Sequence, residues 1–268
     1  MSFQSNPPVS NGSTTLRDAA IRQRAIYVVL AAYNEASNLS AVFREIEGAG
    51  NASRSRLNAI LVNDGSSDST MEVVRSYAGV VPLTVVEHAT NLGLGAAIRS
   101  GLFKAMESAA DGDVIVTMDA DNTHTPADIA RMVNKIDQGF DVVIASRYRK
   151  EAVILGVPMF RRFLSFGASL LFRLMLPVSG VRDYTCGYRV YRASVLRRAM
   201  ARYRQEFIDQ GGFQCMVDIL LKLNSMGVRF AEEPLILRYD RKRGVSKMKV
   251  FRTAFKTLLL LFRRRLGF

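Results

Sequence analysis

Two aspartates, Asp119 and Asp121, have the residue type and spacing that can hold a metal ion. An Asp-x-Asp pair at a strand end can direct two carboxylates, or one directly and one through water, at a single cation. Mg²⁺ and Mn²⁺ prefer oxygen ligands and commonly bind through a few carboxylates together with substrate phosphates. Such an ion stabilises the charge that builds up on a diphosphate leaving group. The pair alone is a weak pattern, but it follows the apolar run 114–118, and this context favours a metal-diphosphate site.

Three further polar segments follow apolar runs in the same way, at residues 33–35, 63–68 and 91–96. Ligands of open α/β sheets bind beyond the carboxyl ends of the strands. Asn, Asp, Gly and Ser also form ordinary turns, so each segment alone is explained equally well as a turn. Four such segments at one sheet edge favour a shared site.

The elements that must position these segments alternate along the chain. Short apolar runs and amphipathic stretches predict strands at 26–32, 57–63, 82–87, 113–118 and 141–146, and helices at 37–47, 68–77, 94–109 and 126–138. Apolar runs of this length between amphipathic helices indicate βαβ units around a mostly parallel sheet. The runs are apolar throughout because helices cover both faces of such a sheet.

The segments after the second and third predicted strands contain candidate nucleotide contacts. A carboxylate at Asp64 can accept a hydrogen bond from the N–H edge of a uracil or guanine ring. The glycines Gly93 and Gly95 resemble part of a dinucleotide fingerprint, but they follow the wrong strand and lack the distal acid of that motif. They are better explained by a close backbone approach at a helix start.

Bulk composition sets the class of protein. The 268 residues are 49% hydrophobic, which is enough for one substantial core. With only two cysteines, Cys186 and Cys215, a disulfide framework is not expected and a reduced, cytosolic setting is the simpler interpretation. Residues 1–24 are polar and are interpreted as a flexible tail rather than a signal peptide. No uncharged apolar run reaches 18 residues, so a spanning helix is not expected.

Charge is distributed unevenly. Residues 1–146 contain 11 Lys and Arg against 16 acids, whereas residues 147–268 contain 26 against 8. Within the basic half, 158–176 and 250–268 interleave arginines with Leu, Phe and Met. Such segments suit a membrane interface with arginines at headgroup level. The alternative is a core-facing helix with basic side chains on its wet side; two such stretches in a basic half favour the membrane.

The polar segments, taken in order, resemble the family 2 glycosyltransferases of the GT-A fold over roughly residues 25–250. The resemblance rests on Ala-Tyr-Asn-Glu at 32–35, Asn-Asp-Gly-Ser-Ser-Asp-Ser-Thr at 63–70, Asn-Leu-Gly-Leu-Gly-Ala at 91–96 and Asp-Ala-Asp at 119–121. Segments 185–192, 212–214 and 240–247 are similar to the dolichol-phosphate mannose synthase branch. In that branch a sugar passes from GDP-mannose or UDP-glucose to a polyprenyl phosphate.

This resemblance implies an α/β, Rossmann-like GT-A fold with a mixed, mostly parallel sheet flanked by helices and with basic amphipathic C-terminal helices. The catalytic domain is expected at 25–248, with a nucleotide-binding half at 25–147 and an acceptor-binding half at 148–248. A basic amphipathic helix is expected at 249–268.

The resemblance also assigns roles by position. The nucleotide would contact the residues Ala32, Tyr33, Glu35, Asp64, Gly93 and Ala120. Asp119 and Asp121 would hold Mg²⁺ or Mn²⁺ and act in catalysis. Arg241 and Lys247 would meet phosphate groups and act in catalysis. The acceptor would be bound by the residues Arg189, Gln214, Arg241 and Lys247.

One departure from the branch concerns the metal site. Branch members usually have Gln two residues after the second Asp, as a further metal ligand, whereas this sequence has Thr123 followed by His124. Threonine is the poorer ligand, and His124 is either a substitute ligand or, more in keeping with its position, part of a helix start.

The mechanism depends on the acceptor. A phosphate monoester has a second pKa of about 6 and is already ionised near neutral pH, so in-line attack with inversion needs no strong base. A hydroxyl acceptor in cell-envelope glycan or glycolipid synthesis would need one. The candidate bases Asp183, Asp209 and Asp218 are each more often structural.

Other classes explain less of the sequence. A nucleic-acid-binding protein would use the basic half but not four polar clusters at strand ends. A nucleotidyltransferase could share the metal pair, a processive synthase would need spanning helices, and a dehydrogenase would need its glycines elsewhere. The expected partners are a nucleotide-sugar donor, a polyprenyl-phosphate or other lipid acceptor and an anionic membrane surface, without nucleic acid. The expected location is the cytoplasmic face of a membrane, with peripheral association, and the oligomeric state stays open.

Overall fold

A seven-stranded sheet forms the centre of the molecule. The computed structural model describes residues 23–53 and 56–244. The strand order is β3-β2-β1-β4-β7-β5-β8. The bounds are β1 Ala25–Ala32, β2 Arg56–Asp64, β3 Leu83–His88, β4 Val114–Asp119, β5 Val142–Ser146, β7 Arg189–Arg192 and β8 Phe230–Pro234. Only β7 runs antiparallel to its neighbours, β4 and β5, so the predicted mixed, mostly parallel sheet is confirmed.

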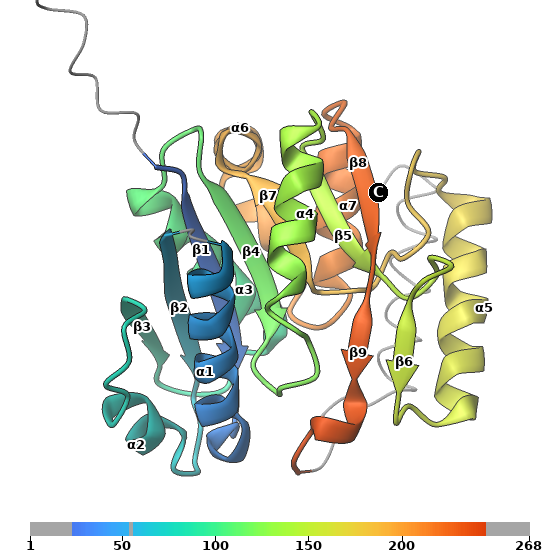
Figure 1. Ribbon diagram of the computed structural model, residues 1–268. Coiled ribbons are helices and arrows are strands. Elements are labelled where there is room, and N and C mark those ends of the chain that lie inside the picture. The colour runs from blue at the N-terminus through green and yellow to red at the C-terminus, as the bar shows by residue number, and fades with distance from the viewer. Residues whose placement is uncertain (1–22, 54–55, 245–268) are drawn as a thin grey trace, which may run out of the picture.

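Helices cover both faces of this sheet (Figure 1). In front lie α1 Ala36–Ser53 and α4 Asp128–Asp137, and behind lie α3 Leu94–Ser108 and α7 Cys215–Asn224. The helix α6 Ala193–Tyr203 packs against α3, and the short α2 Thr70–Arg75 packs against α1. Each helix predicted between residues 37 and 138 is present, with ends that differ by at most six residues.

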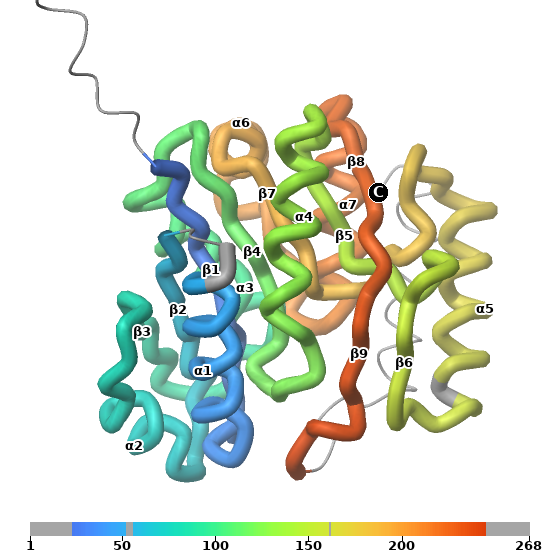
Figure 2. The backbone as a smooth tube through the Cα atoms, viewed as in Figure 1, coloured from blue at the N-terminus to red at the C-terminus, as the bar shows by residue number. Residues whose placement is uncertain are grey.

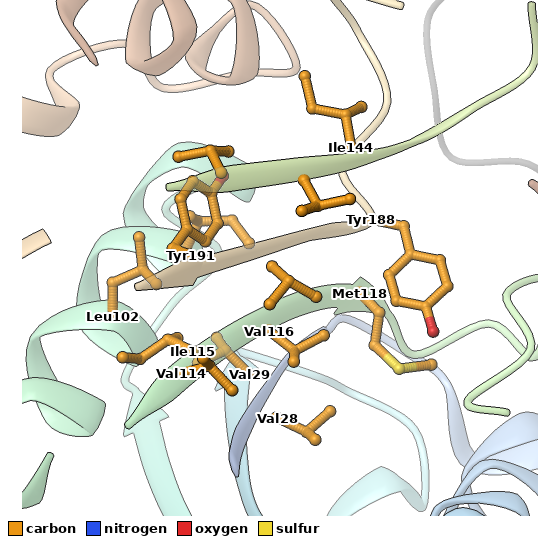
Figure 3. Close-up of a cluster of buried hydrophobic side chains, with 14 of the residues drawn as sticks. Val28, Val29, Leu102, Val114, Ile115, Val116, Met118, Ile144, Tyr188 and Tyr191 are labelled. Carbon is orange, nitrogen blue, oxygen red and sulfur yellow. The ribbon is translucent and has the colours of Figure 1, made fainter. Parts of the chain in front are cut away.

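The core lies between these layers and explains the apolar runs. Figure 3 shows side chains from β1, β4, β5 and β7 packed together with Leu102 of α3. Val28 and Val29 are adjacent in β1 and are both buried, because helices cover both faces of the strand. Burial of successive residues on opposite faces is the property that a parallel sheet imposes on its sequence.

A separate layer lies at one edge of the molecule. The chain leaves β5, forms β6 Val153–Leu155, and continues into the helix α5 Met159–Met175. The strand β9 Ile236–Arg238 pairs with β6 in a two-stranded sheet. Figure 2 shows β9, β6 and α5 side by side at this edge. Two short 3₁₀ helices, η1 Arg204–Ile208 and η2 Tyr239–Arg241, complete the elements.

Over the described ranges, no helix is long and apolar enough to cross a membrane. The helix expected at 249–268 and most of the tail expected at 1–24 lie outside the described residues.

A buried ion pair ties the end of β5 to the loop before β7. Arg147 donates from Nε to Oδ2 of Asp183 at 2.8 Å and from Nη2 to Oδ1 at 2.7 Å. Burial alone would raise the pKa of Asp183, but the Arg147 guanidinium and backbone N–H donors hold that pKa below its ordinary value. The charged carboxylate is therefore favoured in the folded state. Its stabilisation is complete above the unfolded-state pKa of about 3.9 and is lost as the pH falls through the lower folded-state pKa.

Replacing this carboxylate is expected to destabilise the fold. Asp183→Asn leaves Arg147 without its buried partner, and the free energy of unfolding at pH 7 should fall by about 3–5 kcal/mol. The difference from wild type should shrink in acid, below the folded-state pKa of Asp183. Urea unfolding at a series of pH values measures both effects. The control Asp111→Asn removes an exposed partner of Arg197 and should cost less than about 1 kcal/mol. Equal losses in the two variants would contradict a stabilising role for the buried pair.

Candidate active site

The parallel register brings the polar strand ends to one edge of the sheet. Strand β1 pairs in parallel with β2 on one side and β4 on the other, so that Ala31 lies opposite Asp119 and Ala32 opposite Asn63. The loops that follow these three strands are therefore neighbours, as the sequence predicted.

Asn34 fastens the first two of these loops to each other. Its backbone φ is +54°, a left-handed conformation that is uncommon for a residue other than glycine. Its N–H donates to the Ser66 hydroxyl at 2.9 Å, and its side-chain oxygen accepts from the backbone N–H of Ser67 at 2.8 Å. The loop after β1 is thereby held in a fixed position against the loop after β2.

Asp119 and Asp121 lie together at this edge in different environments. The Asp119 side chain is 40% exposed, whereas Asp121 is nearly buried. Asp121 accepts at Oδ1 from the Thr123 hydroxyl at 2.6 Å and at Oδ2 from the Lys242 ammonium at 2.5 Å. Asp121 is therefore fully oriented by its neighbours, and Asp119 is the carboxylate that faces outward.

The two carboxyl groups are shifted in opposite directions. Desolvation by the surrounding protein raises the pKa of Asp119 although part of its side chain stays open to solvent, and repulsion from Asp121 and Glu35 adds to the rise, against the opposing effect of the Lys242 ammonium. Desolvation also tends to raise the pKa of Asp121, but the Lys242 ammonium lowers it below its ordinary value. Asp121 is therefore the more readily ionised of the two carboxyl groups. A cation bound between them would favour the ionised form of both.

His124 positions Asp119. Its Nδ1 accepts from the backbone N–H of Asp119 at 3.1 Å, which places the proton of the neutral ring on Nε2, 4.0 Å from the Asp119 carboxylate. A metal bond through Nε2 would require the proton to move to Nδ1 and would break the contact with the amide. The ring also stacks on Tyr188 with centroids 4.9 Å apart. This geometry disfavours the substitute-ligand role, and His124 does not form the helix start either, because α4 begins at Asp128 with Ala127 as its N-cap.

The residues present fit a hard divalent cation. The Lys242 ammonium contacts Asp121 at the position where a metal cation could bind, so this position accommodates a positive charge. The partly exposed Asp119 supplies a second carboxylate. Within the described part of the chain, no group of three or more His, Cys, Asp and Glu side chains is placed to hold a metal. Two carboxylates with the remaining positions left to water and phosphate suit Mg²⁺ or Mn²⁺.

Asp64 organises the glycine loop beside the site. It accepts from the backbone N–H groups of Leu92 at 2.9 Å and Gly93 at 2.8 Å, and from Nδ1 of His88 at 2.7 Å. Because the carboxylate can only accept, Nδ1 of His88 donates to it, and Nε2 pairs with the Ser100 hydroxyl at 2.9 Å. Asp64 therefore links β2 to β3 and to the start of α3. Its carboxylate already accepts three hydrogen bonds, so the predicted contact with a nucleotide base would be an additional one.

The two glycines allow the backbone approach that the sequence indicated. A Cβ on Gly93 would lie 2.4 Å from the carbonyl oxygen of Gly211, and one on Gly95 would lie 1.8 Å from that of Gln210. The Gly95 N–H donates to the Gly211 carbonyl at 3.3 Å. The loop that leads to the buried Gln214 at the start of α7 is thus packed against the start of α3.

The remaining predicted nucleotide contacts lie in the loop after β1 and in the loop after β4. Ala32 is the buried last residue of β1, Tyr33 and Glu35 follow it, and Ala120 is buried between the two aspartates. Glu35 is also buried and accepts from the side-chain amide of Asn38 at 2.7 Å. These residues share one edge of the sheet with the carboxylate pair.

Two predicted phosphate or acceptor contacts do not fit their placement. Arg189 is 0% exposed, and its guanidinium donates to the backbone carbonyls of Tyr184, Cys186 and Met216. It is a structural residue, because every direction of its planar fork is used inside the core.

Arg241 also points elsewhere. Its Nη1 lies 2.6 Å from the Glu45 carboxylate of α1, and it lines a groove with residues of α1 and α4. The next residue, Lys242, reaches the carboxylate pair instead. Lys242 was not among the residues predicted from the sequence, although it lies in the same basic segment. The backbone turn of η2 directs Arg241 toward Glu45 and Lys242 toward Asp121, and the sequence does not show this turn. Lys247 lies outside the described residues.

The three candidate bases are all held in ion pairs. Asp183 is bound by Arg147, and Asp218 and Asp209 lie 2.6 and 3.4 Å from the Lys222 ammonium. Their carboxylates stabilise the fold, as the sequence analysis judged more usual for such residues.

Comparisons with known proteins identify the family of this chain. The family model described as "Glycosyl transferase family 2" matches residues 27–200. The chain is 30% identical to a polyprenol monophosphomannose synthase of Mycolicibacterium smegmatis over 223 residues, which cover 82% of this chain and 80% of that one. It is also 30% identical to a dolichol-phosphate mannosyltransferase of Pyrococcus furiosus, over 89% of this chain and 63% of the relative.

Similarity to solved structures extends to the fold. Glucosyl-3-phosphoglycerate synthase from Mycobacterium tuberculosis, solved with Mn²⁺, UDP and glucosyl-3-phosphoglycerate, superposes with a TM-score of 0.62 at 18% identity, covering 91% of this chain and 80% of that one. The same enzyme has been solved with Mg²⁺ and UDP. With its GT-A sheet and its Asp-x-Asp pair at the carboxyl edge, this chain belongs to glycosyl transferase family 2 and is a hexosyltransferase.

Proposed function

We propose that this enzyme transfers a hexose from a GDP-mannose or UDP-glucose type of donor to a polyprenyl phosphate, with inversion and with Mg²⁺ or Mn²⁺. The observation that carries the proposal is the Asp119–Asp121 pair, held at the sheet edge beside the loops of β1 and β2. The relatives of M. smegmatis and P. furiosus are named for polyprenol and dolichol-phosphate acceptors, which supports the acceptor class.

The donor would lie across the carboxyl edge of the sheet. The loop of Tyr33 and Glu35 and the carboxylate of Asp64 are proposed to contact the nucleoside. Asp119 and Asp121 would hold the divalent ion, which supplies positive charge against the leaving diphosphate when bound. The Thr123 hydroxyl donates to the Asp121 carboxylate and orients it. Nδ1 of His124 accepts from the backbone N–H of Asp119 and orients that residue. The Lys242 ammonium, which contacts Asp121, would give way to the ion.

The acceptor phosphate would be its own nucleophile. Since a phosphate monoester is ionised near neutral pH, the protein needs to position its oxygen in line with the anomeric carbon and to exclude water. The ion-paired state of Asp183, Asp209 and Asp218 is in keeping with a reaction that needs no strong base. The hydroxyl-acceptor alternative would require one of these pairs to open.

A membrane surface is the proposed source of the acceptor. Along one side of α5 the apolar residues Met159, Phe160, Phe163, Leu164, Phe166, Leu170 and Leu174 are exposed. An exposed run of this kind on an amphipathic helix with basic flanks suits a membrane interface. The helix occupies the outer edge of the molecule (Figure 1). The buried, unpaired cysteines Cys186 and Cys215 support the cytoplasmic side of that membrane.

A short path joins this helix to the carboxylate pair. His124 forms a bridge with Leu237 of β9, and the N–H of Arg238 donates to the carbonyl of Thr123 at 2.9 Å. Strand β9 pairs with β6, which leads into α5. Lipid bound along α5 would therefore be delivered next to the loop after β4.

Loss of either carboxylate is expected to abolish transfer. Asp119→Asn and Asp121→Asn should each lower turnover by at least about a hundredfold, because charge stabilisation at the leaving group is lost. Thermal shifts with GDP, UDP and their sugars should lose their Mn²⁺ dependence; in wild type, a nucleotide at 100 times its Kd adds about 2.7 kcal/mol of stability. The control is Asp111→Asn. Turnover at the wild-type level in both site variants would refute the assignment.

Lys242 is expected to compete with the divalent ion. In Lys242→Met the ammonium no longer lies against Asp121, and Mn²⁺ should bind the nucleotide-free protein roughly tenfold more tightly, a gain of about 1.4 kcal/mol. Isothermal calorimetry with Mn²⁺ measures this. Lys150→Met removes an equal charge at an exposed position and should leave the Mn²⁺ affinity unchanged. Weaker Mn²⁺ binding in Lys242→Met would show that Lys242 does not compete.

The α5 surface is expected to bind lipid vesicles. Phe160→Ser combined with Phe163→Ser removes two exposed aromatic side chains, each worth about 1.5–3 kcal/mol when fully buried, and should strongly reduce flotation with anionic vesicles. Val80→Ser, at an exposed valine between α2 and β3, is the control. Unchanged flotation of the double variant would exclude α5 as the contact.

A further inference from the structure

A pocket lies at the carboxyl end of α5, apart from the carboxylate pair. It is an open pocket with a volume of about 450 Å³, lined by the last turns of α5 and the loop that follows, with Arg149 on one side. In Figure 1 this end of α5 is near the top of the molecule, whereas the carboxyl end of β4, which carries Asp119, is near the bottom. The donor site does not account for this pocket.

Three arginines give the pocket its charge. Arg149, Arg173 and Arg182 line it, and no Asp or Glu does. One carboxylate lies nearby: Glu232, with a buried side chain, is 3.2 Å from Nε of Arg149. The same carboxylate accepts from the backbone N–H of Arg182 at 2.6 Å. Glu232 offsets the charge of Arg149, so Arg173 and Arg182 leave an excess of positive charge at the pocket.

The Arg149–Glu232 contact is incompletely satisfied. Nε of Arg149 and Oε2 of Glu232 are both buried without a hydrogen-bond partner among the described residues, so the contact is an ion pair without hydrogen-bond geometry. Buried polar atoms are normally hydrogen-bonded, and an exception calls for an explanation. The two buried atoms face each other, and a bound anion would instead supply acceptors to the exposed guanidinium groups of Arg173 and Arg182.

The rest of the lining is apolar and continues outward. Leu170, Leu174, Val178 and Val181 form the walls. Leu170 and Leu174 also belong to the exposed apolar side of α5, and Leu174 is 72% exposed. A ligand in the pocket therefore meets arginine donors beside a hydrocarbon surface.

We propose that this pocket binds the phosphate headgroup of a membrane lipid, at a site distinct from the donor diphosphate site. Guanidinium groups match phosphate oxygens through paired, charge-assisted hydrogen bonds. The apolar wall would accommodate the first carbons of the lipid chain, and the headgroup would fix how α5 lies on the membrane. The proposal rests on the proposed membrane contact of α5 and is independent of the identity of the sugar donor.

Vesicle binding by the full-length protein tests the headgroup. Arg173→Gln combined with Arg182→Gln removes two exposed arginines, while Arg149 is kept because it pairs with buried Glu232. Phosphatidylcholine vesicles containing phosphatidic acid are compared with vesicles containing oleate at equal zeta potential. Wild type should prefer phosphatidic acid about tenfold, since a hydrogen bond to a charged group is worth about 1.5–3 kcal/mol. The double variant should lose this preference.

The matched control is Arg75→Gln combined with Arg198→Gln, two exposed arginines on α2 and α6. It should keep the preference, because general attraction to an anionic surface does not distinguish phosphate from carboxylate. Equal binding of wild type to the two kinds of vesicle, or equal loss of preference in the control, would overturn the proposal.

Calorimetry in solution distinguishes a lipid from free phosphate. Dihexanoyl phosphatidic acid should bind more tightly than inorganic phosphate, and Leu174→Ser should weaken only the former. Equal affinities would make the pocket a free-phosphate site and would overturn the lipid assignment. Failure here is separable from failure of the proposed function: Asp119→Asn should keep the vesicle preference and lose Mn²⁺-dependent nucleotide binding, and the Arg173/Arg182 variant should retain that nucleotide binding.

Discussion

Parallel pairing of β1 with β2 and β4 is the constraint on which the site depends. Parallel strands end at the same edge of a sheet, and here that edge collects the loops of Asn34, Asp64 and Asp119. The core makes this register costly to change, because β1, β2 and β4 are buried on both faces. A shift of one residue along a strand would move each side chain to the opposite face. The hydrophobic core thus fixes the positions of residues that take no part in it.

Electrostatic pairing then decides which side chains remain available. The basic residues of the second half do not form a uniform positive surface. Arg189 donates to backbone carbonyls inside the core, and Arg147 forms an ion pair with Asp183. Lys222 forms ion pairs with Asp218 and Asp209. Lys242 contacts Asp121 in the loop after β4, where its charge lowers the pKa that desolvation would otherwise raise. Burial without a partner would be unfavourable for every one of these groups, so their partners indicate their roles.

The edge layer links the carboxylate pair to the apolar surface of α5. The loop after β4 bonds to β9, β9 pairs with β6, and β6 leads into α5. The exposed aromatic residues of α5 and the arginine pocket at its end lie on the same layer. Under the proposed function, this arrangement brings a lipid phosphate and a sugar diphosphate to a common place without any helix that crosses the membrane among the described residues.

The sequence by itself determined the five parallel strands β1 to β5, the helices α1 to α4 between them, and the carboxylate pair that follows β4. These follow from local signals, since strand and helix periods and polar strand ends are written in consecutive residues. It also indicated the close approach at Gly93 and Gly95, although not the loop that approaches them. Tertiary structure alone decided that β7 inserts between β4 and β5, that Arg189 is internal, and that Lys242 rather than Arg241 reaches Asp121. These outcomes depend on contacts between residues far apart in the chain and on the directions of single side chains. Neither kind of information is contained in the periodic pattern of apolar and polar residues from which strands and helices are predicted.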